Sequence, residues 1–234
     1  MNNLQNMEQE KSVLRWGGLA GMLGGVFFIL AMVVTFAGPV GMDDPASLEG
    51  WVTRFPDIKM ARVAENILYL VALLLGVPLF LALYRALRKT SLAPALFGSA
   101  LGILGIVSMV VSTTPHVAHT PLFEIYNAPG ATPADQATIA ILWQMVRGLL
   151  DAMLYVGFFV VPLGLILIGV AMLGTPTFGK GVGGVVVALG GLGFVAAVFQ
   201  MIDPASMVGM GSYFAILISY FVMGRKVYSL SKVS

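Results

Sequence analysis

Polar side chains that could bind a ligand or react occur at one level along several apolar segments of the chain. A charged group beside hydrocarbon is costly unless it turns inward and pairs, so such residues mark a functional site by default. The sequence therefore predicts one polar pocket, whose candidate residues are Arg62, Glu65, His116, Gln144, Arg147 and Asp151.

Two of these candidates form a pair with helical spacing. Arg147 and Asp151 are four residues apart, which places them on one helix face and within reach of each other. One interpretation is an ion pair that lines a pocket. The alternative is an arginine that extends its charged end to the membrane surface beside a local partner. The spacing leaves both interpretations open.

The two histidines of the chain, His116 and His119, are three residues apart and could hold a metal ion. Imidazole and carboxylate groups bind zinc, and Glu65 and Asp151 could complete a zinc or iron site. However, a closed zinc site needs four ligands, and the prolines on both sides of the pair predict a broken turn. We therefore predict no cofactor and keep this four-residue metal site as the alternative.

The composition predicts a membrane protein. Of the 234 residues, 58% are hydrophobic and 10% are charged, whereas soluble domains carry about 25% charged residues. A soluble protein of this length could not bury so much apolar surface, so we expect the lipid bilayer to be its solvent. The absence of Cys excludes disulfides and thiolate chemistry. The net charge of +2 gives no indication of nucleic-acid binding.

Six apolar runs are long enough to cross a hydrocarbon layer of about 30 Å, which takes about 20 helical residues. They predict an all-α polytopic membrane protein with six transmembrane helices arranged as three helical hairpins. The predicted spans are 16–38, 62–87, 93–115, 138–173, 180–201 and 206–228. The remaining segments are a cytoplasmic N-terminal segment (1–15), two long outer loops (39–61 and 116–137) and a cytoplasmic tail (229–234) around the membrane domain 16–228.

The basic residues predict the orientation of the spans. Nine of the thirteen Lys and Arg residues flank one side of the membrane domain: Lys11, Arg15, Arg85, Arg88, Lys89, Lys180, Arg225, Lys226 and Lys232. Because basic flanking segments stay on the cytoplasmic side, we expect a multi-pass protein of the cytoplasmic (inner) membrane with both termini inside. The candidate pocket then opens on the outer face.

Glycine-rich stretches predict where helices touch. Two eleven-residue stretches, one in the third span and one in the fifth, share seven identical positions. Small residues let helix backbones approach closely, so we expect Gly102, Gly105, Gly190 and Gly193 to face other helices. The bulkier second, fourth and sixth spans should then face lipid in part.

A pattern of a capping residue followed by Pro-Ala recurs on the predicted outer face, at residues 44–47, 132–135 and 203–206. Asp, Ser and Thr cap helix N-termini, and Pro fits the first helical position, so each copy predicts a helix start. Thr132 and Asp135 also have the spacing of a capping box.

The first long loop contains the stretch PASLEGWVTRF. Its pattern predicts a short amphipathic helix that lies on the membrane surface, with Trp51 and Phe55 at the interface. Phe-Pro-Asp at 55–57 should then start the second span in a new direction.

Several features together resemble a known family. Arg15 precedes a Gly-rich first span, Arg62 opens the second span, and Leu83-Tyr84 closes it before a basic turn. With a Gly-rich fifth span after a short inner loop, this pattern resembles small bacterial multispan membrane proteins classed as a domain of unknown function. The resemblance covers most of the chain and implies a helical membrane domain without an established activity. The histidine pair and the first long loop are not part of it.

Three classes of function remain open. The first is a non-enzymatic accessory, sensory or lipid-binding protein that takes a protein partner or an amphiphilic ligand at the outer face. The second is a membrane-embedded, metal-dependent enzyme at the histidine pair. The third is a small transporter, which we rank last because transport needs polar residues along a path across the membrane. We favour the first class.

Overall fold

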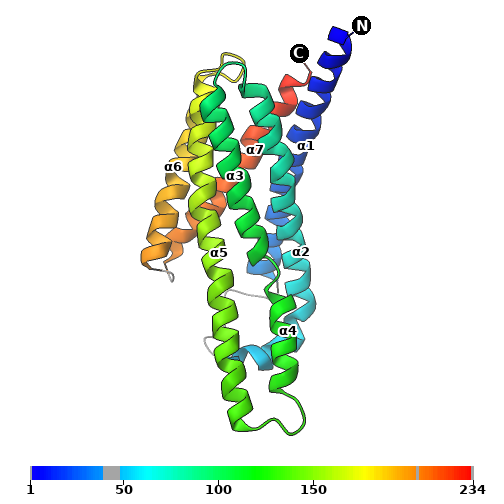
Figure 1. Ribbon diagram of the computed structural model, residues 1–234, viewed down its shortest axis with the longest axis vertical. Helices are drawn as coiled ribbons and strands as arrows, with labels where there is room; N and C mark the ends of the chain where they lie inside the picture. The colour runs from blue at the N-terminus through cyan, green and yellow to red at the C-terminus, as the bar shows by residue number, and fades with distance from the viewer. Residues whose placement is uncertain (1, 39–47, 204–205, 233–234) are drawn as a thin grey trace.

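The structure is a computed structural model that describes residues 2–38, 48–203 and 206–232, apart from the side chains of residues 2–4, 6 and 116. Over this part of the chain it is helical, with no strand. The elements are α1 (Asn2–Ala37), α2 (Leu48–Leu87), α3 (Leu92–Ser112), α4 (Pro115–Tyr126), α5 (Pro133–Leu173), α6 (Lys180–Ile202), a 3-10 turn η1 (Met207–Gly209) and α7 (Met210–Leu230). Both chain ends lie at one end of the molecule (Figure 1), which we call proximal; the opposite end is distal.

Six helical segments in the described part are long and apolar enough to cross a membrane. Four are α1, α2, α5 and α6; the others are α3 continued by α4, and α7 with its preceding 3-10 turn. The prediction of an all-α polytopic membrane protein with six transmembrane helices is therefore confirmed.

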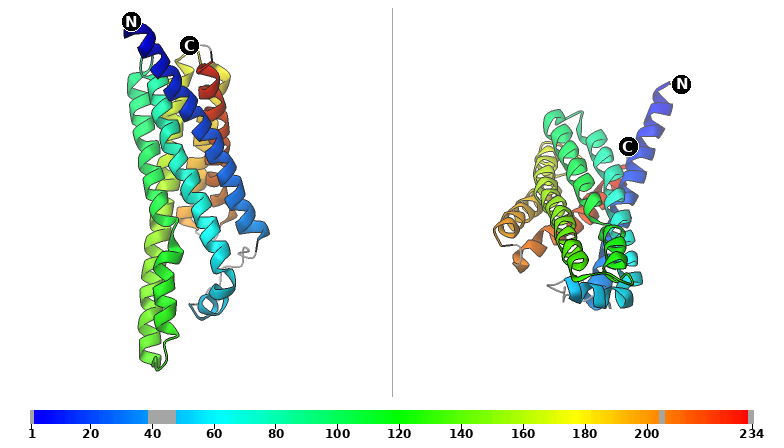
Figure 2. Two further views of the ribbon diagram at one scale, coloured as in Figure 1. Left: turned by 90° about the vertical axis from the view of Figure 1, so that its right-hand side faces the viewer. Right: turned by 60° about the horizontal axis from the view of Figure 1, so that its bottom comes forward.

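The helices pack as a ring in chain order, seen obliquely in Figure 2. α1 contacts α2, α2 contacts α3, α3 contacts α5, α5 contacts α6, α6 contacts α7, and α7 returns to α1. α7 also touches α2 and α5. The ring is compatible with three hairpins, but they are not separate units because α5 also packs along α6 and α1 along α7.

Glycines form the closest helix contacts, as predicted. Gly102, Gly105, Gly190 and Gly193 are all buried. A Cβ atom added at Gly190 would lie 2.8 Å from the backbone nitrogen of Ile166 on α5, so no larger residue fits there without moving a helix. The prediction that these four glycines face other helices is confirmed.

The bulkier helices expose part of their surface, as expected: Leu81 of α2, Leu149 of α5 and Phe214 of α7 are exposed. They are nevertheless not the less buried helices of the bundle. In the most apolar 18 residues of each helix, 56% are buried in α5 but only 33% in the Gly-rich α6. A glycine face is narrow and fits one neighbour closely, while side chains such as Leu192 and Phe199 on the rest of α6 stay exposed. The larger side chains of α5 fill the space between its neighbours.

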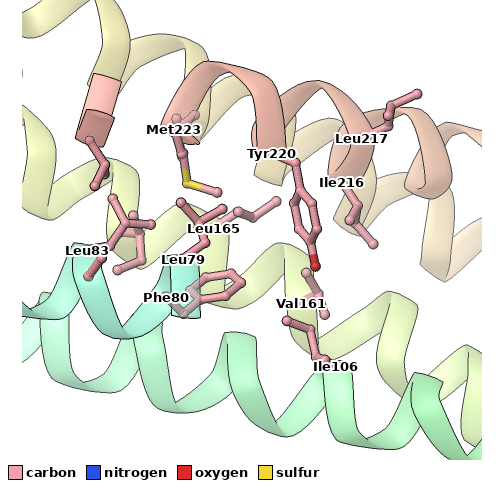
Figure 3. Close-up of a cluster of buried hydrophobic side chains, with 14 of the residues drawn as sticks. Leu79, Phe80, Leu83, Ile106, Val161, Leu165, Ile216, Leu217, Tyr220 and Met223 are labelled. Carbon is pink, nitrogen blue, oxygen red and sulfur yellow. The ribbon is translucent and has the colours of Figure 1, made fainter. Parts of the chain in front are cut away.

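The main core lies where α2, α5 and α7 meet. Figure 3 shows Leu79 and Leu83 of α2, Leu165 of α5, and Tyr220 and Met223 of α7 gathered in one cluster. All five are fully buried. In a membrane such close packing stabilises helix association through van der Waals contact, because lipid is as apolar as the core.

A second, smaller hydrophobic cluster lies at the distal end, and we call it the distal cluster. Its members are Leu48, Trp51, Val52, Phe55, Ile58, Phe123, Ile139 and Trp143. They come from the start of α2, from α4 and from the first half of α5. These segments reach beyond the distal ends of α1, α6 and α7 in Figure 1.

The first predicted outer loop is partly helical, because α2 begins at Leu48 rather than at residue 62. Its first turns run across the bundle before the helix bends into line with its neighbours (Figure 1). Pro56 lies inside this first part of α2, and its missing N–H removes one helical hydrogen bond. Trp51 and Phe55 face other parts of the protein and are buried. Their predicted place at a membrane interface is therefore wrong, since rings of α4 and α5 cover them.

The second predicted outer loop is also partly helical. Residues Pro115–Tyr126 form α4, which starts with Pro115 and continues through Pro121. A proline in the first turn loses no helical hydrogen bond, so the chain before the histidine pair is a helix start rather than a broken turn. His116 and His119 therefore lie on one regular helix.

The capping box before α5 is confirmed. The Thr132 hydroxyl accepts the Asp135 N–H at 3.3 Å, and the Thr132 N–H donates to the Asp135 carboxylate at 2.9 Å. The copy at residues 44–47 lies outside the described residues. At the third copy, Ser206 rather than Asp203 is the cap: its hydroxyl accepts the N–H two residues further on at 3.3 Å.

Candidate functional site

A cavity of about 220 Å³ lies between the main core and the distal cluster. We call it the distal cavity. Its walls come from α2, α3, α4, α5 and α7. Its polar and charged lining residues are Arg62, Glu65, Asn66, Ser112, Thr113, His119, Arg147 and Asp151. The others are Trp51, Phe55, Tyr69, Leu73, Met109, Pro115, Leu150, Leu154 and Tyr213.

The cavity brings together four of the six residues chosen from the sequence. Arg62 and Glu65 line it from α2, and Arg147 and Asp151 line it from α5. The side chain of His116 lies outside the described part of the structure. Two groups from each of two helices thus face one space at the same depth.

Gln144 does not line the cavity, contrary to its selection as a candidate. It is exposed on α5, one turn closer to the start of the helix than Arg147. Trp143 takes the buried position on that turn, with 3% of its surface exposed, and packs into the distal cluster. The polar side chain beside it consequently lies on the open flank of the helix.

Glu65 is the centre of a polar network between α1 and α2. Arg62 Nη1 donates to Glu65 Oε2 at 3.1 Å, and the Thr35 hydroxyl lies 2.6 Å from Glu65 Oε1. Only 7% of the Glu65 side chain is exposed. Partners on both oxygens reduce the cost of burying this carboxylate, which ties the two helices together.

Arg147 is held differently. Its Nε lies 3.9 Å from Asp151 Oδ2, and half of the Asp151 side chain is exposed, so this ion pair is loose. Arg147 Cζ lies 5.3 Å from the ring centroid of Trp143 and 6.0 Å from that of Trp51. The guanidinium is therefore directed over two indole rings and into the cavity wall, which favours the pocket interpretation of this pair.

Trp51 connects the two charged pairs. Arg62 Cζ lies 5.1 Å from its ring centroid, and Arg147 also lies over this ring. A cation is attracted to the face of an indole ring, most strongly where water is excluded. Trp51, which is 7% exposed, thus holds the guanidinium groups of two helices beside one space.

His119 packs among aromatic rings. Its ring centroid lies 5.8 Å from that of Phe123, 6.2 Å from that of Trp143 and 6.5 Å from that of Trp51. Among the side chains that the structure describes, no three His, Cys, Asp or Glu residues gather as metal ligands would. The described geometry therefore gives the metal-site alternative no further support.

Aromatic rings line the cavity on the side of the main core. The ring centroids of Tyr69 and Tyr213 lie 6.4 Å apart, and Tyr213 packs edge-on against Phe158 at 4.3 Å. Phe28 of α1 packs edge-on against Tyr69 at 5.3 Å. The cavity thus has a charged level near the distal end and an aromatic and apolar floor.

The sequence held a signal for part of this site that the choice of polar candidates missed. Trp51, Phe55, Arg62, Tyr69 and Leu73 follow one another at separations of 4, 7, 7 and 4 residues. These separations place all five on one face of a helix. Tyr213 approaches from α7, and no local pattern in the chain connects it with α2.

No protein-family model, curated protein or solved structure matches this chain. The resemblance to small bacterial multispan proteins of a domain-of-unknown-function family therefore stays a prediction, and the distal cavity is the feature from which function is argued.

Proposed function

We propose that this protein binds a small amphiphile in the distal cavity and serves as a non-enzymatic accessory, sensory or lipid-binding protein. The observation that carries the proposal is the cavity itself, with two Arg–carboxylate pairs at one depth and an aromatic, apolar floor. Ligand sites in proteins are typically apolar hollows with a few converging polar groups. A polar head group fits the charged level, and an apolar chain fits the floor.

The size of the cavity supports a small ligand. Its volume of about 220 Å³ corresponds to roughly seven water molecules at about 30 Å³ each. Sites for drug-sized ligands take about 300–1,000 Å³. We therefore propose that the cavity holds a head group with a short chain segment rather than a whole membrane lipid.

The distribution of buried charge supports binding over transport. Among the buried side chains in the described part of the chain, Glu65 is the only Asp, Glu, Lys or Arg. A transport path needs polar groups on both sides of the membrane centre. The charged residues of the cavity all lie on its distal side.

We further propose that the protein resides in the cytoplasmic membrane, with the proximal end inside and the cavity facing out. Arg85 and Lys89 at the proximal end flank Glu10, and nine of thirteen basic residues belong to this side by sequence. Green fluorescent protein fused after Ser234 should fluoresce, and alkaline phosphatase inserted in the turn 128–131 should be active. The reverse pattern would overturn this orientation.

Native mass spectrometry of the purified protein tests the binding proposal. The probes are decanoate, decanol and decyltrimethylammonium, offered separately. We expect the wild-type protein to bind at least one of them at one molecule per chain. Leu154→Trp should fill the cavity and weaken this binding at least tenfold, because Leu154 lines it. The matched variant Leu149→Trp should bind normally, because Leu149 is exposed on the same helix.

Two results would contradict the proposal. One is a wild-type protein that binds none of the three probes. The other is a Leu154→Trp protein that elutes as the wild-type species in size-exclusion chromatography and still binds as well as wild type. The second result would show that any bound amphiphile sits on the lipid-facing surface instead.

A further inference from the structure

Resting on the proposed function, we infer that the distal cavity selects an amphiphile with an oxyanion head group, a carboxylate or a phosphate. Arg62 and Arg147 would hold this head, while the chain points to the aromatic floor.

Two guanidinium groups face the cavity from different helices. Arg62 of α2 and Arg147 of α5 both line it, with their Cζ atoms 5.1 and 6.0 Å from the ring centroid of Trp51. Guanidinium is planar, permanently charged, and matches carboxylate and phosphate oxygens in a two-pronged geometry. Because the ring of Trp51 holds both guanidinium groups beside the cavity, one head group in the cavity can contact both of them.

The two carboxylates of the cavity do not cancel this preference. Both oxygens of Glu65 already have partners, Arg62 at 3.1 Å and Thr35 at 2.6 Å. Asp151 is half exposed and lies 3.9 Å from Arg147 Nε, a long contact that water screens. A head group on Arg147 would compete with this long contact for the guanidinium.

Other groups at the cavity are also donors. The indole Nε1 of Trp51 is buried and has no hydrogen-bond acceptor among the described residues. A buried donor without an acceptor is costly, and a ligand oxygen would remove that cost. α4 begins at the cavity wall with Pro115, and its N-cap Thr114 makes no side-chain capping bond. The positive end of a helix dipole favours an anion at such a position.

The apolar part of the ligand has a place on the floor. Tyr69, Leu73, Met109, Leu154 and Tyr213 line the cavity on the side of the main core. A free anion would use the donors but make no use of this apolar side of the cavity. An amphiphile with a short chain uses both parts of the cavity.

Affinities of five probes, measured by native mass spectrometry, test the inference: decanoate, decyl phosphate, decanol, decyltrimethylammonium and inorganic phosphate. We expect decanoate or decyl phosphate to bind at least tenfold more tightly than decanol and decyltrimethylammonium. Whichever of the two anionic probes binds more tightly identifies the head group as carboxylate or phosphate.

Arg147→Gln is the informative variant, because Arg62→Gln would leave the buried Glu65 without its charged partner. Arg147→Gln should lower the affinity for the anionic probes to that for decanol and leave decanol binding unchanged. Lys59→Gln removes an exposed cation of α2 that does not line the cavity, and it should bind all probes as wild type does. Trp51→Phe keeps an aromatic ring but removes the indole N–H, and it should weaken anion binding by a smaller factor than Arg147→Gln does.

The failures are distinguishable. If decanol or decyltrimethylammonium binds as tightly as decanoate and decyl phosphate, and Leu154→Trp still blocks them, the ligand class is wrong but amphiphile binding stands. If Arg147→Gln binds the anionic probes as wild type does, the assigned head-group site is wrong. Inorganic phosphate binding as tightly as decyl phosphate would replace the amphiphile by a free anion. No binding of any decyl probe would overturn both the inference and the proposed function.

Discussion

The proximal and distal halves of the bundle bring α3 and α5 together in different ways. In the proximal half the two helices meet through glycines on both sides, and a Cβ atom added at Gly164 would lie 2.7 Å from the backbone nitrogen of Gly102. In the distal half a Cβ atom added at Gly148 of α5 would meet no other part of the protein within 4 Å. Toward the distal end, the glycine contacts of α5 with α3 stop at Gly157, which packs against Met109. Met109 also lines the cavity.

This difference shows why the candidate site lies where it does. Backbones held together by glycine leave no room for a side chain between them. Toward the distal end from Gly157, the same two helices carry larger side chains that line the cavity, among them Ser112 of α3 and Arg147 and Asp151 of α5. Close packing ends and the cavity begins within about two turns. The predictions that follow test whether the two halves are as separate as this contrast implies.

Trp51→Ala should have the largest effect, because Trp51 belongs to the eight-residue distal cluster and holds both arginines. Truncating a buried Trp costs about 3–5 kcal/mol. We expect faster amide hydrogen exchange in residues 48–58 and 115–126, with little change in the proximal bundle. Trp16→Ala, at a 69% exposed position, should leave both halves unchanged. Equal loss of protection in α6 and α7 would show that the two halves are one unit.

Glu65→Gln should cost about 3 kcal/mol, because it removes the charge of a buried carboxylate that pairs with Arg62. The loss should appear as a lower unfolding midpoint in a detergent titration. Since Thr35 joins α1 to Glu65, cross-linking yield between cysteines placed at the distal ends of α1 and α2 should fall as well. An unchanged midpoint would mean that the network between these helices contributes nothing to stability.

Gly190→Leu should destabilise the protein by about 2 kcal/mol, since the new side chain meets the α5 backbone at Ile166 and Pro162. A Cβ atom added at the adjacent Gly191 would meet no other part of the protein within 4 Å. Gly191→Leu is therefore the matched control and should leave the unfolding midpoint unchanged. Similar midpoints for the two variants would refute the role of glycine contacts in the proximal half.

Asp151→Asn should have the smallest effect on folding, at most about 1 kcal/mol, because the pair with Arg147 is long and half exposed. Comparison with Glu65→Gln distinguishes the stability contributed by the tight Arg62–Glu65 pair of α2 from that contributed by the loose Arg147–Asp151 pair of α5. Guanidinium unfolding curves measured side by side would show the difference. An equal loss from both variants would mean that the two pairs are equivalent.

The parts of this fold that the sequence predicts are those recorded in local patterns. Apolar length identifies six spans, and glycines such as Gly102 and Gly190 identify contact faces, because both properties depend on one helix at a time. The depth of Arg62, Glu65, Arg147 and Asp151 follows from counting residues along each span. Arg62 and Glu65 share a face of α2, and Arg147 and Asp151 share a face of α5, only because each helix is continuous over these positions.

The remaining parts depend on contacts between segments far apart in the chain. Trp51 and Phe55 have the spacing of an amphipathic helix, but an apolar face of that kind suits lipid and protein equally well. Only the rings of Phe123 and Trp143 decide between them, by covering that face. The contribution of Tyr213 to the cavity floor likewise depends on how α7 lies in the ring.

The order of helices in the ring has a consequence for how the chain assembles. Because each helix packs against the one made just before it, most contacts can form in sequence as the helices enter the membrane. The most extensive exception is the seam between α1 and α7, where Gly18 and Gly25 of α1 meet Tyr228 and Phe221 at the other end of the chain. Until α7 is made, the side of α1 that carries Gly18 and Gly25 lacks this partner, whereas Gly17 already faces Ala82 of α2. Closure of this seam is the last step of assembly, and a chain that ends before α7 would carry an open interface through the membrane.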